Sequence, residues 1–207
     1  MEPNRKSELP RVMQARTMPA KTLRCGDLSG FQTRDDDEGP IIEGYFAVFN
    51  SDYELWPGAI EQVAPGAFAN CLGGDVRALT DHETRLVLGR TTAGTLSLHE
   101  DERGLYGVIK LNVHDQDAMN LYARVQRGDV SQCSFGFDII AEDFEEHPDG
   151  SVLWTIREVF LYEVSVVTFP AYTETSVEAR KNDLETIRRR ELELRRARLK
   201  EKIESWH

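Results

Sequence analysis

The chain has 207 residues, 40% of them hydrophobic and 29% charged, with a formal net charge of −11 at pH 7. This length suits one compact domain with tails, and the acidic excess excludes a general nucleic-acid binder, which needs Lys and Arg to neutralise phosphates. No run approaches the ~18–20 apolar residues of a membrane span, and the N-terminus lacks an apolar signal core, so we expect no membrane contact.

The first 38 residues show no sustained period of two or 3.6, and they end in an acidic cluster at positions 35–38. We expect residues 1–38 to form a flexible leader. Regular structure is predicted to begin at Ile41, because residues 41–49 are rich in β-branched and aromatic side chains and precede a turn-like Asn-Ser-Asp. The folded domain is predicted to occupy residues 39–178.

Short β-type runs separated by turn signals continue to about Thr168. They cover residues 59–63, 75–80, 94–99, 104–112, 132–141, 152–158 and 160–168. The sequence His-Pro-Asp-Gly at 147–150 predicts a tight turn between two antiparallel strands. This count of strands favours a barrel or curled sheet over a βαβ fold.

Two helical patterns interrupt these runs, at residues 66–72 and 115–127. In the second, apolar residues recur with helical spacing, Asp115 is a plausible N-cap and Gly128 a plausible C-terminal cap. Residues 179–207 form a separate tail, with a charge-dense helical stretch from 179 to 206 that lacks Pro and Gly. This tail holds ten Lys or Arg against six Asp or Glu, or +4, and the preceding residues hold 15 against 30, or −15. The basic helix is either a solvated face or a docking element for an acidic partner segment.

Polar residues inside strongly apolar β runs point to a chemical site, because burying them without partners is costly. Ser134 lies in Cys-Ser-Phe-Gly-Phe, and Glu163 lies in a run that otherwise resembles a core strand. His82, in a polar cluster between two apolar runs, is the candidate imidazole. A neutral His can take the hydroxyl proton of a Ser, and a carboxylate can orient the ring. Local spacing does not establish that the three residues meet.

Several alternatives stay open on the residues alone. Ser131 is a rival for the nucleophile, although it stands where a cap or turn residue would. Cys133 is a possible thiol nucleophile, but strand alternation turns it away from the face of Ser134. Glu163 could instead form an ion pair with Arg157, and the acidic neighbours of His82 leave a metal hydrolase as a remote alternative.

The cysteines restrict the choice of cofactor and compartment. Cys25, Cys71 and Cys133 are widely spaced, with no CxxC pair and no histidine cluster at zinc-ligand spacing. We expect neither a disulfide framework nor a zinc site, and we place the protein in a reducing cytoplasm. No metal or organic cofactor is expected.

Five blocks in order resemble the caudovirus prohead serine protease family. They are GYFAVFN at 44–50, PGAF at 65–68, DH at 81–82 with LGRT at 88–91, GDV at 128–130 leading to SFGF at 134–137, and EVSVVTFPAY at 163–172. The resemblance covers about residues 41–176. It places the family's nucleophile at Ser134, its histidine at His82 and its acidic third member at Glu163. Herpesvirus relatives use a second histidine as third member, and none lies in that region here.

The resemblance implies a fold and a function. The fold is a mainly β protein with α-helices (α+β), a closed or nearly closed antiparallel β-barrel surrounded by helices, as in herpesvirus assemblin. The function is a serine endopeptidase that acts inside the immature capsid, in the host cytoplasm, and cleaves scaffold or the delta segment of the major capsid protein, and itself. The herpesvirus relatives imply a homodimer. The alternative is a non-catalytic scaffold or interaction protein with the same barrel.

Overall fold

A computed structural model describes residues 21–24, 31–36, 39–169 and 174–204 of the chain. Its strands are β1 (Lys21–Arg24), β2 (Gln32–Asp36), β3 (Gly39–Val48), β4 (Tyr53–Trp56), β5 (Ala59–Val63), β6 (Arg77–Thr80), β7 (Glu83–Arg90), β8 (Leu96–Glu100), β9 (Gly104–Lys110), β10 (Gln132–Glu146) and β11 (Val152–Val167). Its helices are the 3-10 turn η1 (Thr91–Ala93), α1 (Gln116–Arg127) and α2 (Glu174–Glu204). β1 and β2 lie inside the segment predicted as a leader, so regular structure begins before Ile41.

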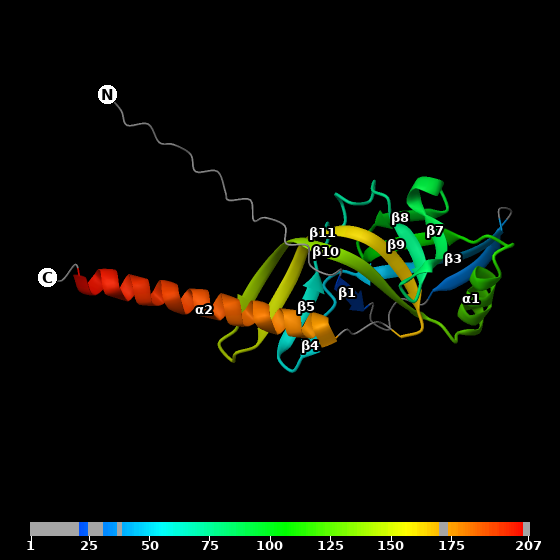
Figure 1. Cartoon of the computed structure of the whole chain (residues 1–207). Helices are drawn as coiled ribbons and strands as arrows, with labels where there is room; N and C mark the ends of the chain where they lie inside the picture. Colours follow the sequence, from blue (N-terminus) through cyan, green and yellow to red (C-terminus); the bar gives the residue numbers. More distant parts are fainter. Residues whose placement is uncertain (1–20, 25–30, 37–38, 170–173, 205–207) are drawn as a thin grey trace, which may run out of the picture.

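The strands form two sheets that face each other across the core (Figure 1). One has seven strands, with β1, β10, β11, β5 and β4 in that order and the β6–β7 hairpin joined to β11. The other has the order β2-β3-β9-β8. The aromatic side chains Phe46, Phe68, Phe135 and Phe137 are fully buried between them. The hydrophobic effect of this burial holds the two sheets together.

The predicted closed antiparallel barrel is wrong, because neither described sheet closes on itself. β11 pairs in parallel with β5 along Val152–Ile156 and in parallel with β6 along Glu163–Val166. Two different strands thus share one edge of β11, and the sheet branches there. A barrel requires its first and last strands to pair, and strand pairing between distant segments is not encoded in the local pattern of either strand.

Several predicted elements are confirmed. The turn at residues 147–150 joins β10 and β11 as an antiparallel hairpin, with the Gly150 N–H donating to the His147 carbonyl at 2.9 Å. In α1 the Asp115 carboxylate accepts from the Asp117 and Ala118 N–H groups, and Gly128 ends the helix with φ 86°. The helix predicted at residues 66–72 is wrong, since that segment is a series of turns. β4 and β7 were not predicted.

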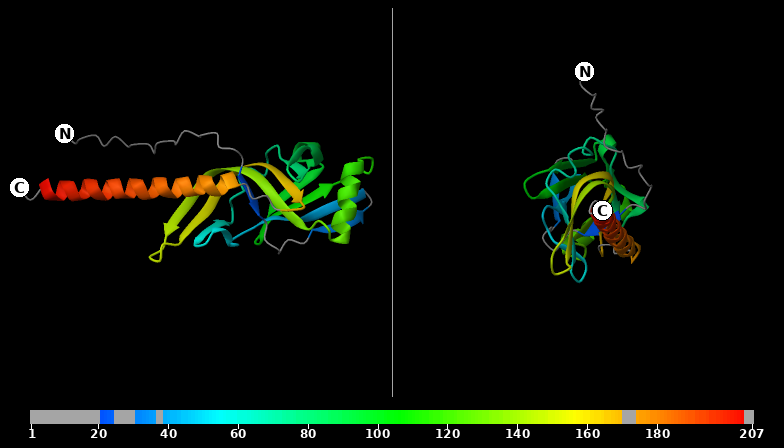
Figure 2. Two further views of the ribbon diagram at one scale, coloured as in Figure 1. Left: turned by 60° about the horizontal axis from the view of Figure 1, so that its bottom comes forward. Right: turned by 90° about the vertical axis from the view of Figure 1, so that its left-hand side faces the viewer.

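The predicted tail helix is present as α2, which begins earlier, at Glu174, and projects from the body (Figure 2). Its attachment to the seven-stranded sheet includes a buried ion pair. Arg180, only 1% exposed, contacts the carboxylate of Glu61 on β5 and that of Glu142 on β10. Leu184 packs with Trp154 beside this pair.

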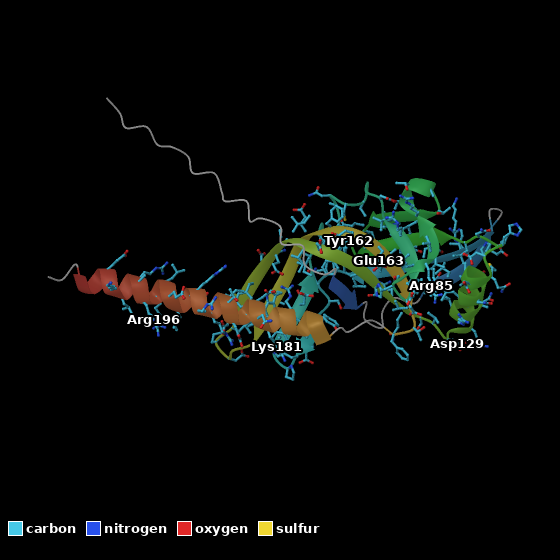
Figure 3. All side chains as sticks on the ribbon, viewed as in Figure 1. Arg85, Asp129, Tyr162, Glu163, Lys181 and Arg196 are labelled. Carbon is cyan, nitrogen blue, oxygen red and sulfur yellow. The ribbon has the colours of Figure 1, made fainter. Side chains whose placement is uncertain are left out.

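Beyond this anchor every residue from 188 to 201 is exposed. Figure 3 shows Arg196 on this projecting part and Glu163 within the body. No helix in the described part of the chain is long and apolar enough to span a membrane.

Candidate active site

His82 occupies a two-residue turn between β6 and β7. Asp81 and His82 have φ values of 47° and 60°, the left-handed conformation that a tight hairpin turn requires at both positions and that non-glycine residues adopt at a cost of about 1–3 kcal/mol each. Contacts with the end of β11 offset this cost. The Asp81 N–H donates to the Val166 carbonyl at 3.0 Å, and the Asp81 carboxylate accepts the Thr168 N–H at 2.7 Å. The strained turn is thereby fixed against β11.

The turn brings the His82 ring into contact with Glu163. His82 Nδ1 lies 2.7 Å from Glu163 Oε1, and both side chains are largely buried, at 23% and 14% exposed. A carboxylate can only accept hydrogen bonds, so it favours the tautomer with the proton on Nδ1. The other ring nitrogen, Nε2, then carries the lone pair. It is buried and has no hydrogen-bond partner within the described ranges.

Ser165 links the two members of this pair, and the sequence analysis did not identify it. Its hydroxyl donates to Glu163 Oε2 at 2.6 Å and accepts the His82 backbone N–H at 3.3 Å. Each carboxylate oxygen therefore has a separate partner, which restrains its rotation. Ser165 lies two residues after Glu163 in the same apolar run, and this spacing, which places both side chains on one face of β11, was the signal available in the sequence.

Ser134 lies on the neighbouring strand, on that same face. The Cα of Ser134 is in register with Ser165, and Gly136 is in register with Glu163. Ser134 is therefore a diagonal neighbour of Glu163, a relation that separates side chains by roughly 7–8 Å. Ser134 is 0% exposed. Among the residues that the structure describes, no hydrogen bond joins the Ser134 hydroxyl to His82 Nε2; such contacts often tighten only when substrate binds.

Gly136 provides the space that the Glu163 carboxylate occupies. A Cβ atom at this position would lie 2.5 Å from Glu163 Oε1 and 3.2 Å from its Cδ and Cγ atoms. The carboxylate thus passes over the backbone of β10, where any side chain would displace it. The SFGF block includes this glycine for a steric reason that the sequence pattern alone did not reveal.

The rival residues are placed elsewhere. Ser131 is exposed before the start of β10. Cys133 is fully buried on the opposite face, with its thiol 3.1 Å from the Tyr45 carbonyl. Arg157 pairs with Asp143 at 2.6 Å, whereas Glu163 contacts His82. Of the two nucleophile candidates on β10, Ser134 is the one that shares a face of the sheet with Glu163.

The described residues were also compared with the requirements of a metal site and of a thiol nucleophile. Among them no group of three His, Cys, Asp or Glu side chains is arranged to hold a metal ion. Within the described residues Cys71 and Cys133 are buried and form no disulfide, and burial raises the pKa of the Cys71 thiol. Cys25 lies outside the described residues.

Two comparisons with known proteins agree on one family. The family described as caudovirus prohead serine protease matches residues 29–190. The prohead protease of Enterobacteria phage HK97 is 35% identical over 177 residues, which cover 81% of this chain and 72% of that protein. The chain belongs to the caudovirus prohead serine protease family. No solved structure was found to match it.

Membership in the prohead protease family identifies the chain as a serine protease of phage capsid maturation. The matched range contains Ser134, His82 and Glu163, and it starts after β1. It also contains the LGRT block at residues 88–91.

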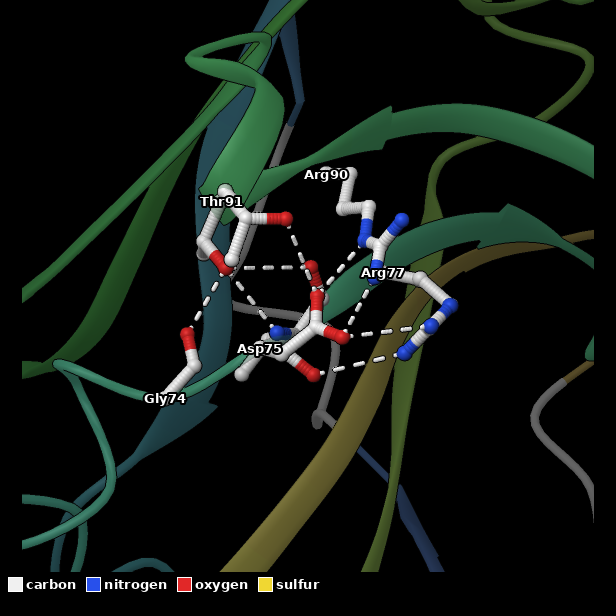
Figure 4. A network of polar contacts seen from close by, with 7 residues as sticks. Gly74, Asp75, Arg77, Arg90 and Thr91 are labelled. Carbon is white, nitrogen blue, oxygen red and sulfur yellow. Dashed lines mark hydrogen bonds and ion pairs between the residues drawn. The ribbon is translucent and has the colours of Figure 1, made fainter.

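An ion-pair network at the base of the β6–β7 hairpin involves that block (Figure 4). Asp75 accepts hydrogen bonds from Arg90 Nε and Nη2, both at 2.6 Å, and Arg77 Nη2 lies 3.2 Å from the same carboxylate. The Thr91 hydroxyl donates to the Gly74 carbonyl at 2.8 Å. The hydrogen bond from Arg90 is the main cause that lowers the pKa of Asp75 from 3.8 to about 2. This network closes the hairpin at the end opposite the His82 turn.

Proposed function

We propose that this prohead protease is an endopeptidase in which Ser134 is the nucleophile, His82 the general base and Glu163 the carboxylate that orients the imidazole. The observation that carries the proposal is the contact between His82 Nδ1 and Glu163 Oε1, at 2.7 Å. Among the described residues the buried Nε2 has no hydrogen-bond partner, and Glu163 shares a face of the sheet with Ser134. A histidine held in one tautomer by a carboxylate is the arrangement that serine proteases use.

The chemistry follows from the positions of the protons. His82 Nε2 takes the proton of the Ser134 hydroxyl while the oxygen attacks the carbonyl carbon of a peptide bond. The imidazolium then gives this proton to the departing amine, and an acyl-enzyme remains. Water, deprotonated by the same Nε2, attacks the ester and releases the new carboxyl terminus and the Ser134 hydroxyl. Glu163 keeps its negative charge throughout and stabilises the imidazolium.

The proposed substrates are the major capsid protein, in particular a delta segment, or a separate scaffold, together with the protease itself. The proposed location is the inside of the immature capsid in the host cytoplasm. Support comes from the family and from the HK97 relative, which is named a prohead protease. Homodimer formation stays a prediction.

The test uses the full chain co-expressed with the coat protein of its phage, followed by gel electrophoresis and intact mass measurement. We expect wild type to cleave the coat protein, and we expect Ser134→Ala and His82→Ala to abolish cleavage. Glu163→Gln should reduce the rate and leave residual cleavage, since the ring loses its orienting charge but keeps its position. Ser131→Ala is the matched control and should cleave like wild type.

Three outcomes would reject the proposal. Undiminished cleavage by the Ser134→Ala protein would exclude Ser134 as the nucleophile. Loss of cleavage in the Ser131→Ala protein would point to Ser131 instead. Absence of cleavage by wild type with coat protein would favour the non-catalytic scaffold instead.

A further inference from the structure

The proposed nucleophile is covered in this structure. Ser134 is 0% exposed, although a peptide carbonyl has to reach its hydroxyl. One edge of β10 is taken by β11 along the whole length of the hairpin. The opposite edge, at residues 134–137, is the only one at which an extended peptide could pair with the strand that carries Ser134.

That edge is occupied by the chain itself. β1 pairs with β10 in antiparallel register, with Arg24 opposite Ser134, Leu23 opposite Phe135 and Lys21 opposite Phe137. Figure 1 labels both strands. Within the described ranges β1 pairs with no other strand and forms the outer edge of the seven-stranded sheet. It is therefore held on one side only, by four residues, and can leave without disturbing any other pairing.

We propose that the edge of β10 at residues 134–137 is a strand-addition site for the main chain of the substrate, and that this chain's own residues 21–24 fill it until a substrate displaces them. Strand addition supplies affinity through backbone hydrogen bonds, which every extended peptide can make. The inference rests on the proposed function, since the edge matters only if Ser134 reacts.

The length of chain that joins β1 to β2 determines how strongly β1 competes with a peptide for the edge of β10. Seven residues separate Arg24 from Gln32, the first residue of β2. Short tethers give an effective concentration on the order of 1 mM. If β1 itself binds the open edge with a dissociation constant of about 100 µM, this concentration exceeds it about tenfold, so a peptide would bind the occupied edge roughly tenfold more weakly than the open edge.

The test measures binding without catalysis, in full-length protein that carries Ser134→Ala. The perturbed version adds Thr22→Pro and Leu23→Pro. Consecutive N–H groups of a strand point to opposite sides, so this pair removes at least one donor to β10. The matched control adds Thr17→Pro and Met18→Pro, which lie outside β1. The probe is a fluorescent synthetic peptide with the sequence of residues 18–26, with serine in place of Cys25.

We expect fluorescence anisotropy to show about tenfold tighter binding to the Thr22→Pro, Leu23→Pro protein than to the parent and the control. Equal dissociation constants in all three proteins, or no binding to any, would overturn the proposal. If the double proline protein loses its cooperative thermal unfolding, Leu23→Gly, which keeps every donor, replaces it in the same comparison. Because no step requires a reacting Ser134, failure of the protease assignment in the cleavage assay would not change this readout.

Discussion

Replacing Gly136 with alanine tests whether the position of the Glu163 carboxylate matters for the reaction. The new Cβ atom would lie 2.5 Å from Glu163 Oε1, whereas ordinary carbon–oxygen contacts begin at about 3.4 Å. Oε1 must therefore retreat by about 0.9 Å. We expect this shift to stretch its 2.7 Å contact with His82 Nδ1 beyond hydrogen-bonding distance. A misplacement of about 1 Å in a catalytic group can cost on the order of 10²-fold in rate, or about 2.7 kcal/mol.

The assay is the initial rate of coat-protein or peptide cleavage. We expect Gly136→Ala to lower kcat about 100-fold, with KM within a factor of three and with an unchanged unfolding temperature. Gly73→Ala is the control, because a Cβ atom at Gly73 meets nothing within 4 Å. Combining Gly136→Ala with Glu163→Asp, whose carboxylate is one methylene shorter, should restore part of the rate. A Gly136→Ala enzyme with kcat within threefold of wild type would refute the reasoning.

Three further substitutions test the site, the anchor of α2 and the ion-pair network of the β6–β7 hairpin. Ser165→Ala frees one carboxylate oxygen and should lower kcat about tenfold or more, since hydrogen bonds to charged groups contribute roughly 1.5–3 kcal/mol; an unchanged kcat in the cleavage assay would contradict this. Arg180→Ala leaves the carboxylate of Glu61 buried without its cation and should lower the free energy of unfolding in urea by about 3–5 kcal/mol, and a loss under 1 kcal/mol would show that α2 is anchored otherwise. Asp75 has a folded-state pKa of about 2, depressed from 3.8. The contribution of its ionised carboxylate to the free energy of unfolding is therefore complete above about pH 4 and is lost as the pH falls through 2. The unfolding temperature of Asp75→Asn should thus be lower than that of wild type at pH 5, and the two should converge toward pH 2; parallel curves would exclude the contact with Arg90 as the cause.

The elements that the sequence predicted well are those whose stabilising contacts are local. α1 begins and ends at the predicted caps because Asp115 and Gly128 act on backbone groups within a few residues. The β10–β11 hairpin forms around a turn whose Pro and Gly restrict the backbone at that position. The segment 66–72 has a helix-like composition, but its turns are closed by i to i+3 hydrogen bonds, such as that from the Cys71 N–H to the Phe68 carbonyl.

The residues of the candidate site also differ in whether a local pattern could reveal them. Ser134 and Glu163 were identified because each is a polar residue in an apolar strand, and His82 because a base was needed and the family blocks supplied its position. Ser165 and Gly136 were missed as parts of the site, since their significance depends on the register between β10 and β11 and on the path of one carboxylate.

The sequence by itself determined the family, the candidate residues, the acidic body with its basic helix, and most of the strands, because these follow from residue types and short-range patterns. The tertiary structure decided that the two sheets stay open, that His82 and Glu163 are in contact, and that β1 lies along the strand of Ser134. Each of these depends on pairing between segments far apart in the chain. Such pairing is selected by the burial of both partners together and by backbone hydrogen bonds that every residue type can form, so no single segment encodes it.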